Sequence, residues 1–224
     1  MIEFISESNL PTRWGEFRIR AYHDYETHTD PVVMIVGDVT DGKDVLTRIH
    51  DQCLTSEVFG SLRCDCREQL EKSMVEIQEE GRGCIIYLHQ EGRGVGLANK
   101  IASYALQDGG YDTVDANREL GFLDDYRDYS SAEKILSDIG VKSIVLMTNN
   151  PRKFKHLRSL NVEISKRVPL VVEKNSHNGP YLDTKQEKMG HVYGSDSDSF
   201  NDDPSLAIYR EWGELMGEGV WELG

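Results

Sequence analysis

Short apolar runs alternate with amphipathic segments along most of this chain, and this alternation restricts the folds that it can adopt. Four segments are predicted to be extended: residues 32–36, 84–88, 143–147 and 164–172. Three amphipathic segments are predicted to be helices: residues 67–80, 96–108 and 130–139. Asn150 and Pro151 are typical of a further helix start, as N-cap and first helical residue. Strands that alternate with helices predict an α/β fold, here a mixed sheet with flanking helices.

The 224 residues are expected to form one domain over residues 1–193 and an extension over residues 194–224. A stretch rich in serine and aspartate begins at Gly194 and is typical of a linker. After it, Asp203 and Pro204 are suited to begin a short helix. Four apolar residues would share one face of that helix: Leu206, Tyr209, Trp212 and Met216. The sequence leaves open whether this segment docks as a helix or stays frayed.

The charge of the chain is strongly negative and unevenly distributed. A net charge of −14 argues against general binding to nucleic acids. Residues 195–224 hold eight acidic residues and one basic residue, a net of −7, so half of the excess lies in the extension. The rest is mildly acidic, and its basic residues gather around the motifs described below. This distribution suits a small anionic substrate held in a local basic pocket.

The start of the chain carries Glu3, Glu7 and Arg13 without an apolar core, so we expect no secretory signal. No run approaches the roughly 20 apolar residues that a membrane span requires, and we expect no membrane association. A reducing cytoplasm, which keeps thiols free, is the expected location.

Three cysteines, Cys53, Cys64 and Cys66, are separated by ten residues and by one residue. Three thiolates with no obvious fourth ligand suit a zinc ion that keeps one position open, as catalytic zinc sites do. If the segment Leu62–Cys66 is extended, the last two cysteines point to one face, and Asp65 points away and stays free for other work. The alternative is that these cysteines are small buried hydrophobic residues, although the charged residues around them weigh against it.

The buried strand predicted to begin at Cys84 leads into a glycine-rich turn at residues 89–96, with the sequence His-Gln-Glu-Gly-Arg-Gly-Val-Gly. Glycines let a ligand approach the backbone, and the free N–H groups at a helix start attract anions. Arg93 adds a forked donor suited to a phosphate. The alternative is an ordinary tight turn, because the glycine spacing is not that of the dinucleotide-binding fingerprint.

Two further polar clusters come from other parts of the chain. Residues 112–128 carry many polar groups without helical amphipathicity, so they could form part of a site or a solvated acidic loop. Residues 148–153 (Thr-Asn-Asn-Pro-Arg-Lys) follow a predicted strand and begin a predicted helix. Because ligands bind at the carboxyl ends of strands in α/β folds, Lys153 could reach a phosphate there. The alternative is an ordinary surface lysine in a first helical turn.

Several segments occur in a recognisable order: the run from Cys53 to Arg63-Cys-Asp-Cys66, and residues 90–97 (QEGRGVGL), 105–108 (ALQD), 112–117 (DTVDAN), 146–151 (LMTNNP), 167–170 (RVPL) and 181–191 (YLDTKQEKMGH). Together they resemble GTP cyclohydrolase II, the enzyme family that opens riboflavin biosynthesis. The resemblance covers roughly residues 1–191 and leaves the extension outside it. It implies zinc-dependent hydrolysis of GTP at C8 of the imidazole ring, to 2,5-diamino-6-ribosylamino-4(3H)-pyrimidinone 5′-phosphate, formate and pyrophosphate.

The resemblance also implies roles for individual residues. The three cysteines resemble the ligands of one zinc ion per subunit, which makes water a usable nucleophile near neutral pH. Asp125 corresponds to a proton acceptor, and Tyr104 to a tyrosine associated with the release of formate. Arg127 corresponds to an arginine proposed as a nucleophile toward the α-phosphate. A guanidinium stays protonated, so we expect Arg127 to stabilise phosphoryl charge instead.

The family likeness extends to the substrate, the second metal and the assembly. Twelve residues align with positions that contact GTP: Arg48, Ile49, His50, Asp51, Gln52, Gln69, Glu91, Gly92, Arg93, Thr113, Thr148 and Lys153. The likeness also implies Mg²⁺ on the triphosphate and a homodimer. Two alternatives remain open: a non-catalytic relative that binds GTP for regulation, and a cyclohydrolase of a specialised pathway that stops at a formylated product.

Three positions depart from the usual family pattern. Gln52 stands in place of a glutamate, which removes a charge beside the first cysteine. Arg67 stands in place of a glycine, and Ser103 in place of an alanine before Tyr104. These departures concern the handling of the substrate and leave the three cysteines unchanged.

Overall fold

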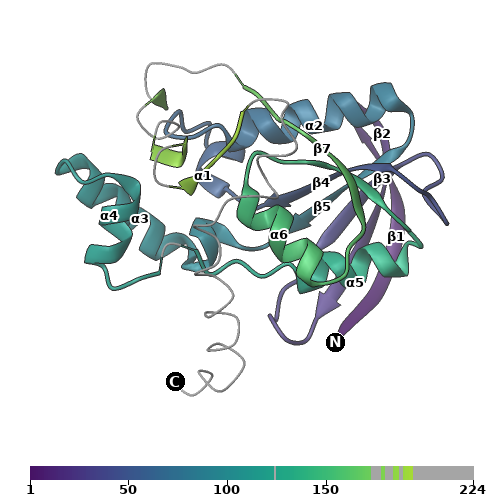
Figure 1. The fold of residues 1–224 in the computed structure, drawn as a ribbon, viewed down its shortest axis with the longest axis horizontal. Helices are drawn as coiled ribbons and strands as arrows, with labels where there is room; N and C mark the ends of the chain where they lie inside the picture. The colour runs from purple at the N-terminus through teal and green to yellow at the C-terminus, as the bar shows by residue number, and fades with distance from the viewer. Residues whose placement is uncertain (124, 173–177, 180–183, 187–188, 194–224) are drawn as a thin grey trace.

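A computed structural model describes residues 1–123, 125–172, 178–179, 184–186 and 189–193. Its strands are β1 (Ile2–Thr12), β2 (Gly15–Asp24), β3 (Val32–Val36), β4 (Val45–Asp51), β5 (Gly83–Leu88), β6 (Ile144–Met147) and β7 (Ile164–Val168). They form one seven-stranded sheet in the order β1-β2-β3-β5-β4-β6-β7 (Figure 1). The α/β fold with a mixed sheet is therefore confirmed. The predicted linker and helix of the extension lie outside the described residues.

The helices are α1 (Leu54–Glu57), α2 (Cys66–Glu80), the 3-10 helix η1 (Glu91–Gly94), α3 (Gly96–Asp108), α4 (Thr113–Glu119), α5 (Ser130–Asp138) and α6 (Pro151–Ser159). The start of α6 follows the predicted capping pattern. The side chain of Asn150 accepts a hydrogen bond from the backbone N–H of Arg152 at 3.0 Å, and Pro151 occupies the first turn. None of the helices in the described part of the chain is long and apolar enough to cross a membrane.

The type of strand pairing changes once across the sheet. The pairs β1–β2, β2–β3 and β3–β5 are antiparallel, whereas β5–β4, β4–β6 and β6–β7 are parallel. Because β4, β5 and β6 are mutually parallel, their carboxyl ends at Asp51, Leu88 and Met147 lie at the same edge of the sheet. The helices α3 and α4 lie beyond that edge, at the left in Figure 1. This edge is where α/β folds place their ligands.

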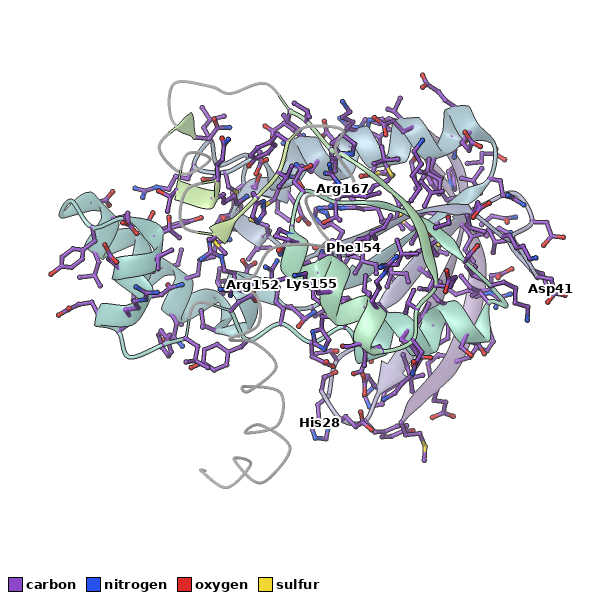
Figure 2. The ribbon with its side chains drawn as sticks, viewed as in Figure 1. His28, Asp41, Arg152, Phe154, Lys155 and Arg167 are labelled. Atoms are coloured by element: carbon purple, nitrogen blue, oxygen red, sulfur yellow. The ribbon has the colours of Figure 1, made fainter. Side chains whose placement is uncertain are left out.

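Apolar side chains cover both faces of the sheet. On β5, Cys84, Ile86 and Leu88 belong to a cluster with residues of α5 and α6, whereas Ile85 belongs to a cluster with residues of α2. This alternation follows from the two-residue period of a strand. Figure 2 shows Phe154 of α6 among the interior side chains, whereas Asp41 lies at a peripheral turn. The central strand β5 is thus buried between α2 on one face and α5 and α6 on the other.

Three strands were not predicted from the sequence. The hairpin of β1 and β2 was missed because β1 is polar and mostly exposed, so no apolar run marks it. The strand β4 was missed because Arg48 and His50 interrupt its apolar residues. Both of these polar side chains are buried in the structure.

One local expectation was wrong. The segment Leu62–Cys66 is not a strand: α2 begins at Cys66, one residue before the predicted helix, and the backbone O of Asp65 accepts from Gln69 N at 3.0 Å. Of the polar residues after Asp112, whose conformation the sequence left open, Thr113–Glu119 form the helix α4. The Asp112 carboxylate caps that helix by accepting from two backbone N–H groups, at 2.8 and 3.0 Å. Seven residues are too few to display a clear amphipathic period.

Candidate active site

A cleft lies at the carboxyl edge of β4, β5 and β6, with about 1030 Å³ of empty space including the part open to solvent. Its basic side chains outnumber its carboxylates. Six lysines and arginines line it: Arg48, Arg93, Lys100, Arg127, Lys153 and Lys185. Two carboxylates do so, from Asp51 and Glu91. In a chain with a net charge of −14, this is the local basic pocket that the sequence predicted for an anionic substrate.

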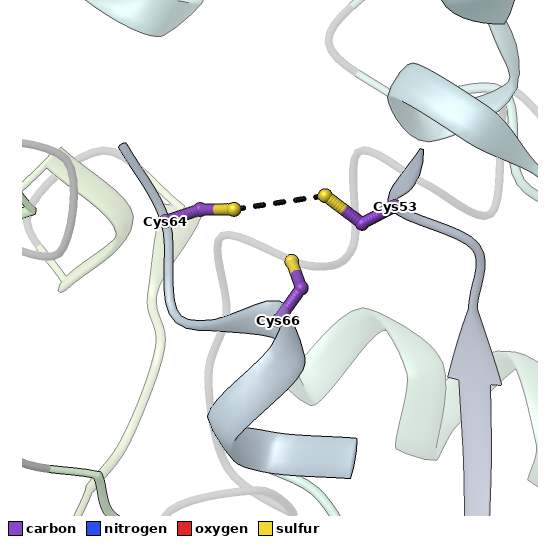
Figure 3. Close-up of side chains that lie close together, drawn as sticks. All are labelled: Cys53, Cys64 and Cys66. Carbon is purple, nitrogen blue, oxygen red and sulfur yellow. Dashed lines mark hydrogen bonds between the residues drawn. The ribbon is translucent and has the colours of Figure 1, made fainter. Parts of the chain in front are cut away.

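Three thiols converge at one side of the cleft (Figure 3). Cys53 follows β4 and precedes α1, Cys64 lies in the turn before α2, and Cys66 begins α2. Their sulfur atoms all lie within 4.8 Å of one another, and the sulfurs of Cys53 and Cys64 are 3.6 Å apart. Figure 3 shows the three side chains pointing toward a common space. Cys84 takes no part, because it is fully buried in the core, as predicted.

The spacing of these thiols fits a metal ion. Sulfurs that share a tetrahedral zinc at about 2.3 Å lie roughly 3.8 Å apart, close to the 3.6 Å observed between Cys53 and Cys64. Thiolates are soft ligands that select zinc over magnesium or calcium. A metal held by three sulfurs would keep its fourth position open, as in catalytic zinc sites. The cluster therefore suggests a zinc site.

Glu57 fixes the backbone of Cys53. Its Oε1 accepts from the N–H of Cys53 at 2.9 Å and contacts His50 Nε2 at 2.8 Å, and its Oε2 accepts from the hydroxyl of Tyr87 at 2.6 Å. The rings of His50 and Tyr87 stack with centroids 5.7 Å apart. Burial lowers the pKa of His50, although the hydrogen bond to Glu57 opposes this. One carboxylate thus joins β4, β5 and the first cysteine.

Lys100 and Glu91 contact the same cysteine from α3 and from the glycine-rich segment. Lys100 Nζ lies 3.1 Å from the sulfur of Cys53 and 2.6 Å from Glu91 Oε1. Glu91 Oε2 accepts from the backbone N–H of Leu54 at 2.7 Å. Burial favours the neutral amine, but Cys53 and Glu91 outweigh it and raise the pKa of Lys100. Both carboxylate oxygens of Glu91 are therefore occupied by protein donors.

A second charged network lies where β4 ends. Asp51 Oδ2 accepts from Arg127 Nη1 at 2.8 Å and from Lys153 Nζ at 3.0 Å. Burial opposes the ionisation of Asp51, but Lys153 and Arg127 outweigh it and hold its pKa well below the usual range. Burial lowers the pKa of Lys153 to about 7, although Asp51 opposes this shift. Lys153 is only 3% exposed, so it is not an ordinary surface lysine.

Arg127 also forms a forked pair with Asp125. Its Nε and Nη2 donate to the two carboxylate oxygens at 2.8 and 2.5 Å. Burial disfavours the charged guanidinium, but Asp125 overcomes this and keeps the pKa of Arg127 well above its ordinary value. Arg127 is therefore a fixed cation at the cleft, and Asp125 lies behind it rather than on the lining.

Arg48 and Gln69 connect β4 to α2. Arg48 donates to the carbonyl of Met147 at 3.0 Å and to Gln69 Oε1 at 2.8 Å, and Gln69 Nε2 donates to Asp65 at 2.5 Å. Asp65 is 1% exposed and also accepts from Lys185 Nζ at 3.0 Å. The prediction that Asp65 stays free is therefore wrong. Its carboxylate anchors α2 to the wall of the cleft.

Tyr104 lies on α3 beside the thiols. Its hydroxyl is 3.5 Å from Thr55 Oγ1, which is 3.7 Å from the sulfur of Cys53. The guanidinium of Arg63 covers its ring, 4.8 Å from the ring centroid. These contacts hold the phenol close to Cys53.

The glycine-rich segment turns sharply after β5. Gly92 and Arg93 both have positive φ angles, +64° and +63°, a conformation that glycine accepts far more readily than arginine. A Cβ on Gly94 would lie 2.9 Å from the Cβ of Tyr126, so the close approach of these two segments requires glycine. Arg93 Nη1 is buried without a hydrogen-bond partner in the described structure. A buried guanidinium donor of this kind is available to a ligand.

The structure brings most of the predicted site residues to one cleft. Eleven of the twelve predicted GTP contacts line it: Arg48, His50, Asp51, Gln52, Gln69, Glu91, Gly92, Arg93, Thr113, Thr148 and Lys153. Tyr104, Arg127 and the three cysteines do so as well. Ile49 and Asp125 are not on the lining, and the side chain of Ile49 belongs to the apolar core.

The three departures from the family pattern differ in position. Gln52 and Ser103 line the cleft, and the hydroxyl of Ser103 accepts from Gln107 Nε2 at 3.1 Å. Arg67 lies outside the lining and pairs with Glu71 on the exposed side of α2 at 2.9 Å. The departures that can affect a ligand in the cleft are therefore Gln52 and Ser103.

Several lining residues were not singled out from the sequence. Lys100 lies one helical turn before Tyr104, a spacing that places both on one face of α3 and could have identified it. Lys185 and His191 come from the end of the described chain; both lie in the segment 181–191 that contributes to the family resemblance, but no role was inferred for either. Burial lowers the pKa of His191 well below its ordinary value, and its Nδ1 has no partner among the described residues.

Comparisons with known proteins point to one family. The family model for GTP cyclohydrolase II matches residues 3–169. The GTP cyclohydrolase-2 of Pseudomonas paraeruginosa is 51% identical over 194 residues, which cover 87% of this chain and 95% of that protein. The riboflavin biosynthesis protein RibBA of Chlorobium phaeovibrioides is 48% identical over 201 residues, 90% of this chain and 49% of that protein. The chain thus spans nearly all of the first relative and about half of the second.

A solved structure gives a more distant similarity. The crystal structure of RibBX, a two-domain 3,4-dihydroxy-2-butanone 4-phosphate synthase from A. baumannii, is 14% identical and aligns with a TM-score of 0.42, over 75% of this chain and 40% of that one. This score is too low to support an argument. The family model and the identity to full-length relatives are sufficient, and the chain belongs to the GTP cyclohydrolase II family.

Proposed function

We propose that this protein is a zinc-dependent GTP cyclohydrolase II that acts in riboflavin biosynthesis. It opens the imidazole ring of GTP at C8 and yields 2,5-diamino-6-ribosylamino-4(3H)-pyrimidinone 5′-phosphate, formate and pyrophosphate. The observation that carries this proposal is the placement of a three-thiol cluster beside a cleft lined by six cationic side chains. The family membership of the chain gives the same reaction.

The two halves of the cleft suit the two ends of the substrate. A zinc ion held by Cys53, Cys64 and Cys66 would supply a Lewis acid and an activated water for the guanine ring. On the other side, Arg127 and Lys153 present positive charge to the triphosphate, and the buried donor of Arg93 is oriented by the glycine-rich turn. A Mg²⁺ ion would bind through the phosphate oxygens.

Individual chain residues would act on the bound nucleotide as follows. The hydroxyl of Tyr104, held beside Thr55, is placed for proton transfer in the release of formate. The pKa of Asp125 is lowered, because Arg127 outweighs the effect of burial, so its carboxylate is ionised; both of its oxygens accept from Arg127, and it would have to leave that pair to accept a proton from the nucleotide. Arg127 stabilises charge on the α-phosphate as a cation, since its pKa is raised rather than lowered.

A product assay tests the proposal. Zinc-loaded protein is incubated with GTP and Mg²⁺, ring opening is followed by absorbance, and formate, pyrophosphate and the mass of the pyrimidine product are determined. We expect one formate and one pyrophosphate for each GTP. Zinc-loaded protein that binds GTP but leaves it intact would support a non-catalytic regulatory relative instead. A product that retains the formyl group would indicate a specialised pathway.

Substitution of a single thiol tests the metal assignment. Cys64→Ser should remove both zinc and turnover, because the two remaining thiolates are one protein ligand short of a catalytic zinc site. Cys84→Ser is the matched control, since Cys84 is buried in the core and should leave the zinc content unchanged. Full turnover by Cys64→Ser would refute the assignment. We further propose a homodimer, which the molar mass in solution tests.

A further inference from the structure

We propose that Lys100 is a positioning residue of the thiol site: its ammonium donates to the sulfur of Cys53 and weakens the electron donation of that sulfur to a bound metal. This inference rests on the proposed zinc site and goes beyond the ligand set itself. Three thiolates neutralise more charge than a divalent ion carries. A cation held against one sulfur keeps such a metal a stronger Lewis acid.

The geometry of Lys100 is that of a fixed contact rather than a passing one. Its Nζ lies 3.1 Å from the sulfur of Cys53 and 2.6 Å from Glu91 Oε1. The side chain is 12% exposed, whereas a lysine on a helix surface normally extends its ammonium into water. Burial of an ammonium is costly unless it is paired and hydrogen-bonded. Here the ammonium is paired with Glu91 and with the sulfur of Cys53. The cost of burying it is therefore compensated at the thiol cluster.

Glu91 holds the ammonium in register with Cys53. Its other oxygen accepts from the backbone N–H of Leu54, the residue that follows Cys53, at 2.7 Å. The same carboxylate therefore fixes both the lysine and the first turn of α1. Glu91 also lies in the glycine-rich turn, as the first residue of η1. The same residue therefore connects the thiol site to the phosphate side of the cleft. Groups that orient metal ligands in this way commonly affect metal affinity or activity about 10–100-fold.

The charge balance gives the contact its chemical effect. Zinc with three thiolates carries a net charge of −1, and a nucleotide triphosphate adds further negative charge to the same cleft. An ammonium at the sulfur offsets part of the first of these, since it is also paired with Glu91, and its N–H group draws electron density from the sulfur lone pair. Glu57, which holds the backbone N–H of Cys53, does not contact the sulfur in any described hydrogen bond. Lys100 is thus placed to act on the sulfur itself.

Cobalt substitution tests the inference without the substrate. The wild-type protein, Lys100→Met and Lys100→Arg are loaded with Co²⁺, and the sulfur-to-metal charge-transfer band is recorded. Lys100→Met should move the band to lower energy, because a sulfur without its N–H donor is easier to oxidise. Lys100→Arg keeps a charged donor and should retain most of the wild-type band position. Lys142→Met, which removes an exposed lysine paired with Asp41, is the control and should not move the band.

Steady-state kinetics with the zinc-loaded proteins provide the second measurement. Lys100→Met should lower kcat/KM for GTP about 10–100-fold, with substantial recovery in Lys100→Arg. A charge-transfer band at the wild-type energy in Lys100→Met would overturn the inference, even if its activity fell. If Lys100→Met fails to fold, Lys100→Gln, which keeps a neutral donor of similar length, should give a smaller shift in the same direction, and no shift would again overturn it. The spectra need no turnover, so a wild-type protein inactive on GTP would refute the proposed function alone.

Discussion

Lys153 and Asp51 lie 102 residues apart in the sequence, yet the lysine Nζ is 3.0 Å from the aspartate Oδ2. The pair joins the first turn of α6 to the end of β4. The same oxygen accepts from Arg127 at 2.8 Å, so one carboxylate stands between two buried cations. This network determines both how stable the cleft is and how it responds to pH.

Asp51→Asn should destabilise the protein by about 3 kcal/mol, because it leaves two buried cations without their shared carboxylate. Chemical denaturation in urea, followed by circular dichroism, measures the free energy of unfolding. Asp41→Asn is the matched control: Asp41 is 78% exposed in its pair with Lys142, so its loss should cost less than about 1 kcal/mol. Equal losses of stability in the two variants would contradict the importance of the buried network.

Glu57 is expected to be as important to the thiol site as to the fold. Glu57→Ala removes the acceptor for the N–H of Cys53 and for the side chains of His50 and Tyr87, and should cost about 2–4 kcal/mol of stability. Because Cys53 then loses its backbone anchor, zinc should bind about tenfold more weakly or worse. Competition with a chromogenic chelator measures the zinc affinity.

The control for Glu57 is Glu71→Ala on α2. Glu71 makes an exposed i,i+4 pair with Arg67, which is worth about 0.5 kcal/mol or less. Its removal should leave the zinc affinity unchanged. Wild-type zinc affinity in Glu57→Ala would show that the carboxylate serves the fold alone.

Sequence patterns predicted the parts of this protein that depend on local periodicity. The strand at Cys84 and the helix that begins at Pro151 carry their own signals, an apolar run and a capping pair; the strand was predicted close to its observed bounds and the helix at its observed start. The polar strand β1 carries no such signal, because its neighbours in the sheet and not its own composition make it extended.

The site divides in the same way. The thiol cluster and the glycine-rich turn were predicted from local patterns, the spacing of the cysteines and the glycines between a strand and a helix, and the family resemblance supported both. The contact of Lys100 with Cys53 could not be predicted by such means, since it joins residues 47 apart through the packing of α3 against the cleft. The family resemblance names both Asp125 and Arg127 but does not say which of them faces the cleft. Only the structure shows that Arg127 lines the cleft and that Asp125 is paired with it off the lining.

Cys84 should be chemically inert in the folded protein. It is fully buried, and burial raises the pKa of its thiol to about 11, so little thiolate exists at neutral pH. Brief treatment of the metal-free native protein with iodoacetamide at pH 7.5 should therefore leave Cys84 unlabelled, whereas Cys53, whose pKa the neighbouring thiols and Lys100 lower, should be labelled. Peptide mass analysis should find Cys84 labelled only after unfolding in urea. Labelling of Cys84 in the native protein at the rate of Cys53 would contradict its place in the core.

Lys153 should make nucleotide binding sensitive to pH. Its pKa is lowered to about 7 by burial, so the ammonium is present below that pH and lost above it. A triphosphate binds the charged form, and at pH 9 that charge must be regained at about 1.4 kcal/mol for each pH unit above 7. The dissociation constant of GTP should therefore rise by up to about 50-fold between pH 7 and pH 9, a range in which the triphosphate itself stays ionised.

Isothermal titration calorimetry on metal-free protein, which cannot turn GTP over, measures this slope. Lys153→Met should bind GTP more weakly at pH 7. Its dissociation constant should change little between pH 7 and pH 9, because methionine does not ionise. Lys155→Met is the matched control from the same helix: Lys155 does not line the cleft, and Figure 2 labels it beside Arg152. It should keep the wild-type slope, since Asp51 and Lys153 are untouched. A steep slope in Lys153→Met would assign the pH dependence to another group of the cleft and remove Lys153 from the phosphate side of the site.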